Sequence, residues 1–278
     1  MREFYCMRTA LTIAGSDSGG GAGIQADLKT FAAHGVYGTC AVTAVTAQNT
    51  LGVTAWQALP ADLVTAQIEA VAGDIGAHAV KVGMLANAAI VEAVAAAIES
   101  LDLPLVVVDP VMIAKGGDRL LEEEAVAAML AELLPRAHMV TPNVPEAEVL
   151  TGLSIRTPTD MRRAARVLVE HGAGAVLVKG GHLGGPDAID VLDDGRTAVE
   201  LAAPRLPMRH THGTGCQLSA AITAGLASGH ALRDAIDTAK RFISVAIGAG
   251  LAIGKGDGPA NPLAWLPADP AAMRSAGR

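Results

Sequence analysis

The chain has 278 residues, enough for one large domain, because a single hydrophobic core stops growing near roughly 250 to 300 residues. Hydrophobic residues make up 51% of the sequence and aromatic residues 3%, so aliphatic side chains must build the core. The formal net charge of -7 argues against sequence-independent binding of nucleic acid, which depends on Lys and Arg neutralising phosphates.

Short aliphatic runs alternate with segments of helical periodicity, a pattern typical of parallel strands joined by crossover helices. The helix segment NAAIVEAVAAAIES follows a capping Asn87, and EEEAVAAMLAELL carries acidic residues in its first turn. A later segment, AIDVLDDGRTAVEL, predicts a β-hairpin around Asp194 and Gly195. We therefore predict an α/β domain with a mostly parallel sheet. The predicted strands are Ala10 to Ala14, Thr39 to Val45, Ala79 to Val82, Leu105 to Val108, His138 to Thr141 and Ala175 to Val178.

The first strand, LTIAG, continues into the glycine-rich SDSGGGAG. A helix is predicted to follow, with Ile24, Leu28 and Phe31 on its apolar face and Gly35 ending it. Glycines before a helix let a ligand approach the backbone closely, but a tight structural turn would also use them. The sequence leaves both interpretations open.

Polar residues follow several of the predicted strands at the edge where ligands bind in such sheets. Asp109 ends one strand, and Asn143 and Glu146 follow the next, three residues apart. Each has a purely structural explanation as a helix cap, but together they suit Mg²⁺ with water and phosphate completing its shell. Lys179 ends a further strand, where it either extends to solvent or binds phosphate.

The stretch HTHGTGCQLSAA begins a predicted helix, because Leu218, Ala221, Ile222 and Leu226 share one helical face. Backbone N–H groups in its first turn can converge on an anion, assisted by the helix dipole; they belong to Gly213, Thr214, Gly215 and Cys216. The Cys216 thiol at this place has either a lowered pKa, if exposed, or is buried and inert.

The cysteines and the two ends of the chain indicate the cellular compartment and the limits of the folded domain. The cysteines, Cys6, Cys40 and Cys216, are far apart and odd in number, which indicates a reducing cytoplasm. The longest uncharged stretch, Gly38 to Ala61, is too polar to span a membrane. Residues 1–9 are expected to form an N-terminal extension, and the Pro-rich tail 259–278 is expected to wrap the surface or to be disordered.

Seven ordered motifs between about Leu11 and Gly258 resemble those of the hydroxymethylpyrimidine/phosphomethylpyrimidine kinases of thiamine biosynthesis, members of the ribokinase-like superfamily. The motifs are AGSDSGGGAGIQADLKTF, AVTAVTAQNT, KVGMLA, VVVDPVM, VTPNVPEAEVLTG, VLVKGGH and THGTGCQLSAA. The resemblance implies one three-layer α/β/α domain and a homodimer. It also implies transfer of the ATP γ-phosphate to a hydroxymethylpyrimidine and then to its monophosphate, with no nucleic acid or membrane as a partner.

The resemblance also implies roles for individual residues. The pyrimidine would be held by Gly15, Ala22, Asp27, Gln48, Met84 and Val111. Mg²⁺ would lie near Asp109, Asn143 and Glu146, and the nucleotide near Lys179 and Thr211. The anion hole would be Gly213, Thr214 and Gly215, with Cys216 at the place where related sugar kinases carry the catalytic base.

Two alternatives to the pyrimidine kinase stay open. One is a pyridoxal kinase on the same fold. The other is a pyrimidine sensor without catalytic turnover, which the retained Asn143, Glu146 and GTGC elements disfavour.

Overall fold

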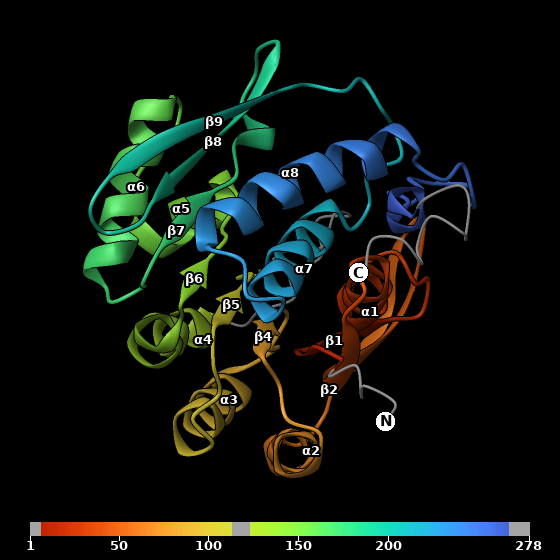
Figure 1. The fold of residues 1–278 in the computed structure, drawn as a ribbon, viewed down its shortest axis with the longest axis vertical. Helices are drawn as coiled ribbons and strands as arrows, with labels where there is room; N and C mark the ends of the chain where they lie inside the picture. Colours follow the sequence, from red (N-terminus) through yellow and green to blue (C-terminus); the bar gives the residue numbers. More distant parts are fainter. Residues whose placement is uncertain (1–6, 113–122, 267–278) are drawn as a thin grey trace, which may run out of the picture.

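The computed structural model describes residues 7–112 and 123–266, which form a nine-stranded sheet covered by helices on both faces (Figure 1). The strand order is β3-β2-β1-β4-β5-β6-β7-β8-β9. All neighbours from β2 to β7 pair in parallel, whereas β3 at one edge and β8 and β9 at the other pair antiparallel. The strands are β1 (Thr9–Asp17), β2 (Tyr37–Asn49), β3 (Gly52–Ala58), β4 (Ala79–Val82), β5 (Val106–Val108), β6 (Met139–Val140), β7 (Val176–Val178), β8 (Asp187–Asp193) and β9 (Ala198–Pro204).

The sheet separates two apolar layers, which confirms the predicted α/β class. One face packs against α2 (Ala61–Asp74), α3 (Ala88–Ser100), α4 (Glu123–Ala128), α5 (Val144–Thr151) and α6 (Pro158–Glu170). The other face packs against α1 (Gly23–Ala33), α7 (Thr214–Ala227) and α8 (Leu232–Gly248), and Figure 1 shows α7 and α8 crossing the sheet together. Side chains of the strands alternate between these layers, as a sheet buried on both faces requires.

Local sequence explains where several of the helices begin and end. The Asn87 side chain accepts a hydrogen bond from the Ile90 N–H and caps α3, as predicted. Asn143 and Glu146 form a reciprocal capping box at α5. Gly35 follows α1 in the left-handed conformation (φ 72°), which only glycine adopts without strain.

The structure differs from the sequence prediction in two elements. Strand β3 was not predicted, because each of its residues is at least partly exposed and its pattern therefore lacks a buried face. The predicted helix EEEAVAAMLAELL is shorter than expected: α4 ends at Ala128, and a π-helical turn (Met129–Leu133) and a 3-10 turn (Leu134–Arg136) follow. Pro135 cannot continue an α-helix, because it lacks the N–H group.

The chain ends are described in part. Strand β1 begins at Thr9, inside the predicted N-terminal extension. In the tail, Trp265 of the 3-10 turn Pro262–Trp265 packs against His34 and Phe242, so 259–266 covers α1 and α8. Residues 1–6 and 267–278 lie outside the described residues. Within the described ranges, no helix combines the length and the apolar character that a membrane crossing needs.

Candidate active site

A pocket of ≈ 690 Å³ opens where the parallel strands end, as expected for ligand sites in open α/β sheets. Its size is that of a typical small-molecule site. All the predicted site residues except Asp27 line it. They are Gly15, Ala22, Gln48, Met84, Asp109, Val111, Asn143, Glu146, Lys179, Thr211, Gly213, Thr214, Gly215 and Cys216.

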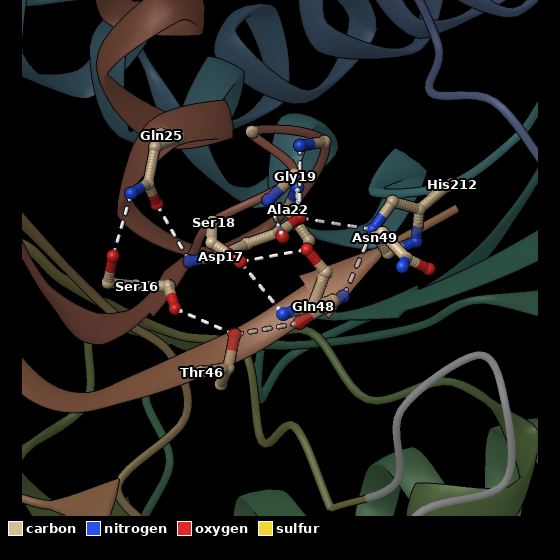
Figure 2. A network of polar contacts seen from close by, with 12 residues as sticks. Ser16, Asp17, Ser18, Gly19, Ala22, Gln25, Thr46, Gln48, Asn49 and His212 are labelled. Atoms are coloured by element: carbon tan, nitrogen blue, oxygen red, sulfur yellow. Dashed lines mark hydrogen bonds and ion pairs between the residues drawn. The ribbon is translucent and has the colours of Figure 1, made fainter. Parts of the chain in front are cut away.

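Asp17, at the end of β1, organises the glycine-rich loop (Figure 2). Its Oδ1 atom accepts a hydrogen bond from the Gly19 N–H (2.7 Å), and its Oδ2 atom accepts from Gly21 (3.0 Å) and Ala22 (2.8 Å). Burial alone would raise the pKa of Asp17, but His212 and the backbone amides outweigh it and hold that pKa below its ordinary value. The loop is therefore shaped around a carboxylate, and it brings Ala22 to the pocket wall.

Gln48, near the end of β2, lies beside this loop (Figure 2). The Ser18 hydroxyl bridges to its backbone, 2.8 Å from both the Gln48 nitrogen and the Gln48 oxygen. Its side-chain Oε1 lies 3.2 Å from Thr46 Oγ1, and its Nε2 lies 3.3 Å from His212 Nε2. The side chain of Gln48 is thus oriented by neighbours on β2 and on the chain before α7.

The first turn of α7 forms another wall of the pocket. Gly213 caps this helix in the left-handed conformation (φ 77°), and a Cβ atom there would lie 1.8 Å from the Gly21 carbonyl oxygen. Gly215 and Cys216 follow within the first helical turn, where backbone N–H groups have no acceptor inside the helix. The two glycine-containing loops therefore interlock, and the first turn of α7 presents backbone N–H groups of the kind that can bind an anion.

Lys179 and Asp109 form an ion pair between this terminus and the acidic side of the pocket. Lys179 Nζ donates to Asp109 Oδ1 at 2.7 Å. A Cβ atom on Gly215 would lie 3.3 Å from Lys179 Nζ, which places the ammonium beside the first turn of α7. Burial alone would raise the pKa of Asp109, but Lys179 and Lys81 keep it below its ordinary value. A cation thus lies beside the N-terminus of a helix, an arrangement that suits a phosphate group.

Glu146 is a buried acidic group of the pocket. It is 7% exposed, and its Oε2 atom accepts a hydrogen bond from the Asn143 N–H (2.7 Å). Burial raises the pKa of Glu146 to about 7; Lys179 opposes this rise and Asp109 adds to it. Because Mg²⁺ is typically bound through one or two carboxylates plus phosphate oxygens, the oxygen donors of Asp109, Asn143 and Glu146 fit that ion.

A second buried ion pair lies beneath the pocket. Lys81 of β4 and Asp27 of α1 are both 0% exposed, and Lys81 Nζ donates to Asp27 Oδ2 at 2.8 Å. The Thr12 hydroxyl donates to the same oxygen at 2.7 Å. Lys81 borders the pocket, whereas Asp27 does not. Asp27, which was expected to contact the pyrimidine, thus lies behind the pocket wall in this structure and holds Lys81.

The Cys216 thiol lies in the pocket wall near this pair. Burial raises the pKa of Cys216 to about 11, against the opposing effect of the Lys81 ammonium. Of the two interpretations that the sequence left open, this raised pKa favours the inert thiol in the ligand-free protein. The thiol is protonated at neutral pH.

The pocket also contains residues that were not predicted as site residues, among them Asp17, Lys81 and His212. Lys81 carried a usable signal, because a lysine inside the aliphatic strand AVKV must find a buried partner. Neither Asp17 nor His212 carried a sequence signal of its own, because their contact joins residues 195 positions apart in the sequence.

Substitution of Glu146 by glutamine is expected to stabilise the metal-free protein at alkaline pH. The folded pKa of about 7 exceeds the ordinary value of 4.5, so this residue's stabilising contribution is complete below pH 4.5 and is lost as the pH rises through 7. The difference of 2.5 pKa units corresponds to about 3 kcal/mol. Glutamine keeps the capping box, so urea unfolding with chelator should show the variant more stable at pH 8 and equal at pH 4.5. Equal stability at pH 8 would contradict the buried charge.

Comparisons with known proteins agree on one family. The chain matches the family model described as phosphomethylpyrimidine kinase over residues 17–261. A hydroxymethylpyrimidine/phosphomethylpyrimidine kinase of Rhizobium meliloti (strain 1021) is 53% identical, over 90% of this chain and 95% of that protein.

Two solved structures are also similar. Phosphomethylpyrimidine kinase from Clostridium difficile 630 is 43% identical with a TM-score of 0.76, covering 85% of this chain and 97% of that chain. An ADP complex of Bacillus subtilis pyridoxal kinase is 41% identical with a TM-score of 0.87, covering 93% of this chain and 98% of that chain.

Proposed function

The chain belongs to the phosphomethylpyrimidine kinase family, and we propose that it uses ATP to phosphorylate 4-amino-5-hydroxymethyl-2-methylpyrimidine and then its monophosphate, in thiamine biosynthesis. The observation that carries the proposal is the continuity of one pocket, which joins the amide of Gln48 to Lys179 and the first turn of α7. One end suits a small polar ring, and the other suits a phosphate.

At the ring end, an aminopyrimidine presents donors and acceptors along its edge, and the carboxamide of Gln48 can pair with both. Met84 supplies an apolar surface for the ring. A Cβ atom on Gly15 would lie 2.9 Å from the Met84 sulfur, so glycine leaves the room that this methionine occupies. The sequence resemblance assigns Ala22 and Val111 to the same end, and both residues line the pocket.

At the phosphate end, the hydroxymethyl oxygen forms a bond to the γ-phosphorus while the bond from that phosphorus to the β,γ-bridging oxygen breaks and ADP leaves. Backbone amides of the α7 terminus and Lys179 are placed to stabilise the charge on the transferred group. Asp109, Asn143 and Glu146 would hold Mg²⁺, which supplies further charge neutralisation when bound. In a reaction of this kind positioning and charge stabilisation provide most of the rate.

Cys216 is the proposed acceptor of the hydroxyl proton, as a thiolate. Because its pKa is raised to about 11, the thiolate fraction grows about tenfold per pH unit between pH 8 and 9.5. We therefore expect kcat to rise with this slope in the wild type and to be lower and flat in Cys216→Ser. A wild-type kcat that is independent of pH in this range, or a serine variant with near-normal turnover, would contradict the base role.

The reaction is tested by mass spectrometry of the products formed from hydroxymethylpyrimidine and Mg·ATP. Successive appearance of the mono- and diphosphate with stoichiometric ADP is expected. Pyridoxal is the second candidate substrate, favoured by the similarity to the Bacillus subtilis pyridoxal kinase. A higher kcat/KM with pyridoxal than with the pyrimidine would reverse the order of the two. Binding of the pyrimidine without any release of ADP would instead indicate a sensor.

A homodimer in the reducing cytoplasm is proposed on the sequence resemblance and on cysteine usage. The two cysteines within the described residues, Cys40 and Cys216, are free thiols, as a reducing compartment requires. Light scattering of the purified protein tests the dimer.

A further inference from the structure

His212 joins the two loops of the pocket through a single ring nitrogen. Its Nε2 atom lies 3.2 Å from Asp17 Oδ2 and 3.3 Å from Gln48 Nε2 (Figure 2). The imidazole is 14% exposed and the Asp17 carboxyl 3%, so water replaces neither contact easily. The next residue is Gly213, which caps α7. His212 thus lies between the ring end and the phosphate end of the pocket.

The contact with Asp17 fixes where the proton of this imidazole lies. Asp17 is an ionised carboxylate, because its pKa is lowered, and it can only accept hydrogen bonds. A nitrogen lone pair 3.2 Å from that oxygen would be repelled. The Nε2 atom of His212 therefore carries a hydrogen in either the neutral or the charged form of the ring, and it donates that hydrogen to Asp17.

That assignment conflicts with a second donor at the same place. The Nε2 atom of Gln48 carries two hydrogens and no lone pair, yet it lies 3.3 Å from the protonated Nε2 atom of His212. A parallel conflict exists at the other amide atom. The Thr46 hydroxyl has one hydrogen, which it donates to the Ser16 carbonyl oxygen at 2.9 Å, so it leaves none for Gln48 Oε1 at 3.2 Å.

A half-turn of the Gln48 amide removes both conflicts at once. Its oxygen then accepts from His212, which shares one N–H between Asp17 and Gln48, and its nitrogen donates to the free lone pair of Thr46. We propose that His212, held by Asp17, is a specificity-determining positioning residue that fixes the Gln48 amide with its oxygen toward His212 and its nitrogen toward Thr46. The proposal rests on the proposed pyrimidine kinase function.

The fixed order matters for the choice of substrate. A carboxamide pairs with an amino group and the adjacent ring nitrogen through two hydrogen bonds, as Asn and Gln do with adenine. The pairing requires that the amide oxygen faces the amino group and that the amide nitrogen faces the ring nitrogen. A bidentate pair of this kind discriminates by roughly 5- to 150-fold. A ring without the amino group loses the hydrogen bond to the amide oxygen and gains less from this order, so His212 should favour aminopyrimidines over pyridoxal.

The experiment compares two variants with two ligands. His212→Leu removes the Nε2–H donor, whereas His212→Gln can return an amide N–H to the same place. The ligands are hydroxymethylpyrimidine and its analogue without the amino group, and Kd is measured by calorimetry alongside KM and kcat. For the aminopyrimidine we expect His212→Leu to raise Kd and KM about tenfold, and His212→Gln to recover most of this loss. For the analogue without the amino group, which keeps one of the two hydrogen bonds, His212→Leu should raise Kd by a clearly smaller factor.

A second measurement distinguishes a specific effect on the Gln48 amide from a general disturbance of the loops. In a Gln48→Ala background, His212→Leu should have no further effect on Kd, because its effect passes through the Gln48 amide. Equal losses for both ligands, an equal loss in the Gln48→Ala background, or a matching rise in KM for ATP would overturn the proposal and leave His212 as a structural link. If the wild type binds the pyrimidine but releases no ADP, the proposed function fails while the Kd comparison still decides the role of His212. Absence of binding overturns both.

Discussion

Substitution of Gly213 by alanine is expected to lower kcat by about 10²- to 10³-fold, the cost of losing a donor from an oxyanion-type site. The Cβ atom of alanine would lie 1.8 Å from the Gly21 carbonyl oxygen and 2.8 Å from its carbon, and both atoms belong to the backbone. The two loops must therefore separate. Since the amides of Gly215 and Cys216 follow directly, the anion site moves with them.

The matched control is Gly229→Ala, just beyond the other end of α7. Gly229 also has a left-handed conformation (φ 86°), but a Cβ atom there meets nothing within 4 Å. This variant bears only the conformational cost of a left-handed residue, about 1–2 kcal/mol. Steady-state kinetics and urea unfolding of both variants separate the effects. If Gly213→Ala turns over as fast as Gly229→Ala, the close packing against Gly21 is not what shapes the anion site.

The sequence predicted those parts of the candidate site in which the ends of parallel strands bring residues together. Parallel strands present their carboxyl ends on one edge, so Asp109, Asn143 and Lys179 could be grouped from their positions after three strands. Helical periodicity likewise predicted α7 and its first turn. In both cases the local sequence pattern is sufficient, because the crossover connections of a parallel sheet place the strand ends and the following helices on one edge.

The remaining features depend on contacts that no local pattern encodes. Asp27 was expected to contact the pyrimidine, but its side chain on helix α1 pairs with Lys81 of β4 behind the pocket wall. The contact between Asp17 and His212 forms because two loops interlock at Gly21 and Gly213. The glycines allow this close packing, but their presence in the sequence does not predict it. The raised pKa of Cys216 likewise follows from tertiary burial and opposes what a helix N-terminus alone would suggest.

Substitution of Lys81 by methionine is expected to destabilise the protein by about 3–5 kcal/mol at pH 8, because it leaves the Asp27 carboxylate buried and unpaired. The remaining polar contact of that carboxylate is the Thr12 hydroxyl, and its Oδ1 atom is already buried without a hydrogen-bond partner among the described residues. Lys81 also borders the pocket near Cys216, so kcat should fall as well.

The pH dependence of this loss identifies its cause. Burial raises the pKa of Asp27 above 3.8, and Lys81→Met removes the largest effect that opposes this rise. The contribution of Asp27 to stability is then present below its unfolded pKa and is lost as the pH rises through the folded value, so the variant should be less destabilised at pH 5 than at pH 8. The double variant Asp27→Asn, Lys81→Met keeps an acceptor for Thr12 and carries no buried charge. Its stability should recover in part at pH 8, and its remaining deficit should not change with pH. A deficit of the single variant that is equal at pH 5 and pH 8 would mean that lost packing of the lysine stem, and not the stranded carboxylate, is responsible.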